Sequence, residues 1–243
     1  MTKPNSPVRE RPRDLVTSTL AKQILSGVFP PGAKLPTETE LGEQLGVSRT
    51  ALRESIRTLA GKGLIESKTR SGTVVLSPTQ WNHLDPELLG WREELAPDLD
   101  FARSLTEARQ VIEPAAARFA AERATGQDLG RMQDSFDAMC RADAQDIEAS
   151  VSADESFHLA VLAASHNPVF INFGAMVGTA LRNAFRLTTS ASENFAATLD
   201  MHGEVLEAIR MRRPDEAGQR MAELLDIASR DLARVIAQEA GGA

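Results

Sequence analysis

The chain has 243 residues, 42% of them hydrophobic, and is long enough for two compact domains with ordinary apolar cores. It contains no run of about 18 apolar residues, and its polar, proline-rich start lacks the apolar segment of a signal peptide, so neither a membrane-spanning nor a secreted protein is indicated. The single cysteine, Cys140, cannot form an internal disulfide, and we expect a cytoplasmic protein.

The net charge of −7 is distributed unevenly along the chain. Residues 1–76 carry 12 Lys and Arg against 7 Asp and Glu, whereas residues 77–243 carry 15 against 27. The N-terminal part is basic and the remainder is acidic, which suggests that only the N-terminal part binds the phosphates of nucleic acid. The basic excess alone is small, so this interpretation requires a supporting motif.

The first predicted helices are arranged as a helix-turn-helix. Apolar residues at helical spacing indicate a helix over about 15–25. Thr37 and Glu40 have the spacing of a capping box, which predicts a second helix over 38–45. Ser48 is placed to cap a third helix over 49–61, directly after a glycine turn.

Two strand-like runs, 64–68 and 73–76, then predict a β-hairpin wing with a basic tip that contains glycine. In helix-turn-helix proteins the start of the second motif helix enters the major groove, and a wing adds contacts to the backbone. Alternatively, the arginines of the helix over 49–61 form only a solvated face, but the capped helices, the wing and the charge split together favour DNA binding. The predicted DNA-binding residues are Ser48, Arg49, Thr50, Arg53, Lys68, Arg70 and Gly72.

The remainder of the chain is predicted to be helical. A linker with a short helix over 78–97 carries both tryptophans, Trp81 and Trp91. Helical periods follow over 99–124, 127–142, 146–164, 168–190, 196–212 and 214–238. We therefore expect a mainly α protein with a disordered arm at 1–9, a winged helix-turn-helix of three helices and a hairpin at 10–77, the linker at 78–97, and an all-α bundle of six to seven helices at 98–240.

Three residues of the predicted bundle form a candidate metal site. Asp154 and His158 are four residues apart and share one helix face, and His202 on a distant helix supplies a third ligand across the bundle. One carboxylate and two imidazoles suit a divalent metal, Zn²⁺ first and Ni²⁺ or Mn²⁺ as alternatives, with open positions for a chelating ligand. The alternative is that both histidines are merely hydrogen-bonded in the core.

Two arginines lie on largely apolar predicted helices. A buried guanidinium is costly unless it is paired, so Arg109 and Arg182 are either solvated, ion-paired within the protein, or placed to bind an anionic effector. Glu107, Glu113 and Asp154 are the structural partners available for such ion pairs. With Asp154, His158 and His202, the two arginines are candidates for binding a small carboxylate.

The helix-turn-helix and wing resemble the DNA-binding domain of the GntR family of transcription regulators. The resemblance is carried by residues 35–38, 45–50, 53–54, 59, 63–65 and 72–75. Arg49 and Arg53 occupy family positions, whereas Thr39 stands where the family usually has an arginine that touches DNA. This departure implies an altered operator specificity.

The helical part resembles the FCD effector domain of the fatty-acid-regulator (FadR) subgroup, and most closely its galactonate-operon repressor branch. The subgroup resemblance is carried by residues 109–114, 120–121, 154–158, 165–168, 202 and 205–209. The branch resemblance is carried by 80–85, 91, 121–125 and 166–169. The resemblance directs Arg109 and Arg182 toward the effector cavity. The usual metal site of the subgroup has another histidine where this chain has Leu224, which cannot ligate.

The resemblance implies a homodimer on a pseudo-palindromic operator in double-stranded DNA, released when a sugar acid such as an aldonate or a 2-keto-3-deoxy acid binds. Another hydroxy acid or dicarboxylate is the alternative effector. A metal-dependent hydrolytic enzyme built on Asp154, His158 and His202 is a rival of another class, but the sequence offers no nucleophile elbow or phosphate loop. A DNA-binding protein without any effector is a further alternative.

Overall fold

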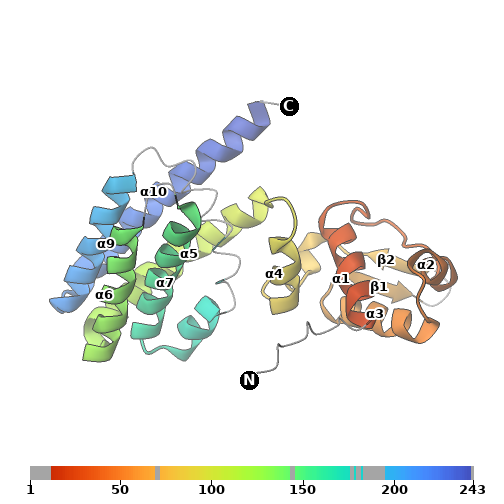
Figure 1. Cartoon of the computed structure of the whole chain (residues 1–243), viewed down its shortest axis with the longest axis horizontal. Helices are drawn as coiled ribbons and strands as arrows, with labels where there is room; N and C mark the ends of the chain where they lie inside the picture. Colours follow the sequence, from red (N-terminus) through yellow and green to blue (C-terminus); the bar gives the residue numbers. More distant parts are fainter. Residues whose placement is uncertain are drawn as a thin grey trace, which may run out of the picture. The chain divides into compact units, whose positions relative to one another are not determined.

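A computed structural model describes residues 12–68, 72–142, 146–175, 178, 182 and 195–241 (Figure 1). The chain divides into two compact units, Met1–Ala96 and Pro97–Ala243. The expected arm at 1–9 and the wing residue Arg70 lie outside the described residues. Among the described helices, none combines the length and apolar character that crossing a membrane requires.

The first unit begins with three helices and a hairpin. These elements are α1 (Pro12–Leu25), α2 (Glu38–Leu45), α3 (Arg49–Gly61), β1 (Ile65–Lys68) and β2 (Gly72–Val75). The two strands are antiparallel, with Ile65 opposite Val75 and Lys68 opposite Gly72. Leucines and isoleucines from all three helices and the hairpin form one apolar core. A bridge between Lys34 and Val74 extends the hairpin and was not predicted from the sequence.

Local capping explains where the helices of the motif begin and end. The Thr37 side chain accepts a hydrogen bond from the Glu40 amide, and the Glu40 carboxylate accepts one from the Thr37 amide, which confirms the capping box. Gly46 ends α2 in the left-handed conformation with φ 64°. The Ser48 hydroxyl then accepts a hydrogen bond from the Ala51 amide and caps α3. These signals fix the turn between α2 and α3.

The segment after the wing packs onto the first unit. It contains the short helix η1 (Pro78–Gln80) and α4 (Pro86–Glu93), whose N-terminus is capped by the Asp85 carboxylate. Lys62 Nζ lies 2.7 Å from Asp85 Oδ1, and Trp91 belongs to the apolar core of this unit. The tryptophan-bearing segment is therefore a fixed part of the unit that contains the helix-turn-helix.

The second unit is a helical bundle. Its named helices are α5 (Leu99–Arg123), α6 (Gly126–Arg141), α7 (Ile147–Ala164), α9 (Phe195–Arg210) and α10 (Pro214–Gly241). Their bounds closely match the predicted helices. Of the helix predicted over 168–190, residues 168–175 are helical and most of the remainder lies outside the described residues. In this unit α5 packs against α7, α9 and α10, which brings side chains from distant parts of the chain to one place.

Candidate functional site

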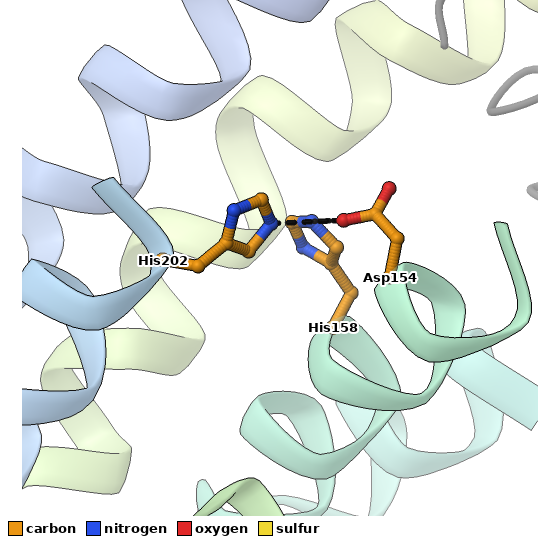
Figure 2. A group of neighbouring side chains, drawn as sticks. All are labelled: Asp154, His158 and His202. Carbon is orange, nitrogen blue, oxygen red and sulfur yellow. Dashed lines mark ion pairs between the residues drawn. The ribbon is translucent and has the colours of Figure 1, made fainter. Parts of the chain in front are cut away.

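The three predicted metal ligands lie together in the second unit. Asp154 and His158 project from α7 and His202 from α9, and one candidate ligand atom of each lies within 4.8 Å of the others. Figure 2 shows both imidazole rings turned toward the Asp154 carboxylate. Both histidines are buried, with 2% and 4% of their surfaces exposed. The fold therefore gathers one carboxylate and two imidazoles, as the spacing predicted.

Hydrogen bonds orient both imidazole rings. His158 Nδ1 lies 2.5 Å from Glu113 Oε2, and His202 Nδ1 lies 2.6 Å from the carbonyl oxygen of Thr198. An ionised carboxylate and a carbonyl can only accept hydrogen bonds, so each Nδ1 carries the proton and donates it. Each ring consequently presents its Nε2 atom to Asp154. Metal-binding histidines are commonly held in this way by an oxygen on the far side of the ring.

The atoms that face one another here are close but incompletely paired. Asp154 Oδ1 lies 2.8 Å from His202 Nε2 and 3.6 Å from His158 Nε2. The 2.8 Å contact lacks hydrogen-bonding geometry, so Asp154 Oδ1 and His202 Nε2 are buried without a hydrogen bond. Buried polar atoms without a hydrogen bond are costly. A divalent cation among these three atoms would satisfy them, so the residues present fit such an ion.

The site is strongly charged. Burial would raise the pKa of Glu113, but the charges of Arg109 and His158 outweigh burial and lower this pKa to about 2. Burial would lower the pKa of His158, but the Glu113 carboxylate outweighs it and raises this pKa to about 9. The pKa of Asp154 would rise on burial, and the neighbouring imidazoles bring it well below its ordinary value instead. The carboxylates are therefore ionised at neutral pH. Without a metal, His158 carries a second proton, on Nε2, which compensates part of their charge, and a metal bound at Nε2 would displace that proton.

The two predicted effector arginines are both ion-paired. Arg109 on α5 is only 2% exposed, and its Nε lies 2.6 Å from Glu113 Oε1, which is one of the structural pairings considered for it. Arg182 Nε lies 3.1 Å from Glu155 Oε2, and 41% of the Arg182 side chain is exposed. Glu155 was not among the expected partners, because sequence spacing does not connect residues 27 positions apart.

Leu224 lies on α10 and is 4% exposed within the apolar core of the bundle. The same core contains Phe157, whose ring meets those of His158 and His202 nearly edge-on. The site thus has three protein donors beside the Phe157 ring, and a metal with three protein ligands keeps coordination positions for oxygens of a ligand.

The predicted DNA-reading residues gather at the start of α3. Arg49 and Thr50 occupy its first turn and are exposed, and Ser48 caps the helix. Arg53 is also exposed, but its Nε lies 2.9 Å from Glu38 Oε2 on α2. The sequence does not predict this pair, because it depends on how α2 and α3 pack against each other. On the hairpin, Lys68 ends β1 opposite Gly72, which begins β2 with φ 85°.

Most of the chain matches two known protein families. Residues 12–75 match the family of bacterial regulatory proteins named after gntR, and residues 104–227 match the FCD domain. The first range covers the helix-turn-helix with its hairpin, and the second contains Asp154, His158 and His202.

Individual relatives extend over both units. The chain is 38% identical to the galactonate operon transcriptional repressor of Escherichia coli K12, over 91% of this chain and 97% of the relative. It is 31% identical to a putative L-lactate dehydrogenase operon regulatory protein of the same organism, over 78% and 74%. A solved structure of Lar, which controls the agr system of Listeria monocytogenes, matches with a TM-score of 0.65 at 19% identity, over 93% and 99% of the two chains, and supports the fold.

Proposed function

Because the chain belongs to the GntR family of transcription regulators and carries an FCD domain, we propose that it is a homodimeric repressor of a sugar-acid catabolic operon, released from its operator by that acid. The family makes it a ligand-responsive DNA-binding regulator and not an enzyme. The sugar acid, the dimer, the metal and the individual site residues are the parts that we propose.

The observation that carries the effector assignment is the group of three candidate ligand atoms inside the bundle, in a chain that is similar to a galactonate operon repressor over 91% of its length. Arg109 is buried in its pair with Glu113, so we propose Arg182, whose side chain is 41% exposed, as the arginine that contacts the carboxylate. Asp154, His158 and His202 would hold a divalent ion, Zn²⁺ first and Ni²⁺ or Mn²⁺ as alternatives, which supplies a Lewis acid for the carboxylate and hydroxyl oxygens of an aldonate. A shorter hydroxy acid is the second candidate, because a further relative is named for an L-lactate dehydrogenase operon.

We further propose how release occurs. Two copies of the first unit bind the half-sites of a pseudo-palindromic operator, with Ser48, Arg49, Thr50 and Arg53 at the major groove. The wing residues Lys68, Arg70 and Gly72 approach the DNA backbone. An effector weakens this complex only if it binds better to an arrangement of the dimer that fits the operator poorly. A coupling of about 1–3 kcal/mol corresponds to about a 5- to 150-fold loss of operator affinity.

A thermal-shift panel tests the effector and the metal together. The full-length protein is heated with D-galactonate, a 2-keto-3-deoxy acid, L-lactate or a dicarboxylate, each with and without a chelator. Ligand at 100 times its Kd stabilises the folded state by about 2.7 kcal/mol, which raises Tm by roughly 5–10 °C for a chain of this size. We expect the largest shift with D-galactonate and a smaller one after chelation.

Arg182→Gln is the test variant for carboxylate binding and Arg103→Gln is its control. Arg103 is an exposed arginine on α5 that pairs with Asp100 at the helix surface, so its loss changes the net charge equally without touching the site. Arg182→Gln should lose most of the galactonate shift and Arg103→Gln should keep it. A shift by L-lactate alone would replace the sugar acid with the shorter hydroxy acid, and a panel without any shift would contradict the effector assignment.

A further inference from the structure

Glu113 is a buried carboxylate between the candidate ion site and Arg109. It lies on α5, is 1% exposed, and does not belong to the group of three ligands. Its Oε1 lies 2.6 Å from Arg109 Nε, and its Oε2 lies 2.5 Å from His158 Nδ1. Removing a carboxylate from water is costly, so a buried position of this kind calls for a role that an apolar side chain could not fill.

The contact with His158 determines which ring nitrogen is presented to the ion. A carboxylate accepts hydrogen bonds only, so it holds the proton on Nδ1 and leaves Nε2 directed at Asp154. Without that acceptor, a neutral His158 is free to carry its proton on Nε2 and donate it to Asp154, and a protonated nitrogen cannot ligate a metal. The ring would also lose the hydrogen bond that joins it to α5.

The two histidines are held by different means. His202 Nδ1 donates to the backbone carbonyl of Thr198, which no substitution removes. His158 relies on a side chain from another helix, 45 residues earlier in the chain. A substitution of Glu113 therefore changes how His158 is held and leaves all three candidate ligands in place.

We propose that Glu113 is a positioning residue of the ion site, which fixes the tautomer and orientation of His158, and that Arg109 holds Glu113 in place. This inference rests on the proposed function, since it requires that the three ligands bind a divalent ion. It assigns to the pair Arg109 and Glu113 a role distinct from contact with the effector. Loss of a group that hydrogen-bonds to a metal ligand typically changes metal affinity by about 10- to 100-fold.

The test is the affinity of the full-length protein for Zn²⁺, measured by competition with a fluorescent chelator. Glu113→Gln removes the carboxylate and keeps the shape of the side chain. Because this variant removes the carboxylate charge 2.6 Å from the buried Arg109 and can fail to fold, the double variant Arg109→Met with Glu113→Gln removes both charges together. We expect each folded variant to bind Zn²⁺ about 10- to 100-fold more weakly than the wild type.

Asp128→Asn is the matched control. Asp128 Oδ2 lies 2.9 Å from His166 Nε2, so this variant also replaces the carboxylate of a carboxylate–histidine pair in the same unit, but its histidine is not one of the three ligands. It should bind Zn²⁺ with wild-type affinity. A nitrogen-15 spectrum of the Zn²⁺-loaded protein provides the second readout: the wild type should show His158 protonated on Nδ1 and bound through Nε2, and the Glu113 variants should lose this signature.

The outcomes separate the inference from the function on which it rests. If the wild type binds Zn²⁺ and the Glu113 variants bind it equally well with the same His158 signature, the positioning role is overturned and the ion site stands. If the wild type itself does not bind Zn²⁺ at micromolar concentration, the ion site and the positioning role both fall. Weaker binding in the Glu113 variants but not in Asp128→Asn supports the inference.

Discussion

Replacing Arg49 with alanine is expected to weaken binding to operator DNA by about 5- to 150-fold, the equivalent of about 1–3 kcal/mol for one bidentate contact to a guanine. Arg49 is the first residue of α3 and is exposed at the helix end that enters the groove in helix-turn-helix proteins. Arg53 shares its face, but its guanidinium is engaged by Glu38. Arg49 is therefore the side chain from which we expect the larger contribution to base recognition.

Fluorescence anisotropy with an operator selected from a random DNA pool measures this effect. The discrimination between operator and scrambled DNA should shrink in Arg49→Ala, because a base contact carries sequence information and a phosphate contact does not. Arg103→Ala, with the same charge change in the second unit, should bind as the wild type does. If Arg49→Ala kept wild-type affinity and discrimination, Arg49 would not contact the bases of the operator.

Replacing Leu224 with histidine is expected to raise the affinity for Zn²⁺ by roughly 100-fold. Structural zinc sites with four protein ligands bind with about 10–16 kcal/mol, or roughly 3 kcal/mol for each ligand. This chain offers three donors, and Leu224 lies in the same apolar core as Phe157, which contacts both histidine rings. From the resemblance to FCD domains, we expect position 224 to be where a fourth ligand would reach the ion.

The control for this gain is Leu225→His, since Leu225 is equally buried in the same core but projects from α10 in a different direction. Both variants bury an imidazole in place of leucine and should lose about 1–3 kcal/mol of stability without metal. Zn²⁺ should stabilise Leu224→His more than Leu225→His, because Leu225→His keeps only the three original donors. An equal Zn²⁺ response of the two variants would show that position 224 does not face the ligands.

The parts of the fold that the sequence predicted are those governed by local signals. Thr37, Glu40 and Ser48 cap helices through residues three positions away, so their patterns are visible in the sequence and the structure confirms them. Asp154 and His158 are related by one helical turn, and their shared face followed from the spacing. Helical periodicity located the helices of the bundle for the same reason.

The contacts that escaped prediction join distant segments. The pairs of Glu113 with His158, Arg182 with Glu155 and Arg53 with Glu38 depend on how helices pack, which periodicity does not encode. The packing of α4 through Lys62 and Asp85 is of the same kind. For Arg109, the sequence left open an effector contact or an ion pair, and the structure shows the ion pair with Glu113.

The measurement that tests the central proposal most directly is the operator affinity of the full-length wild type with and without saturating D-galactonate. An effector-released repressor requires the affinity to fall by about 5- to 150-fold when the sugar acid is added. The same concentration of L-lactate should leave it unchanged. Equal affinity with and without D-galactonate, in a protein that binds its operator, would contradict release by this sugar acid.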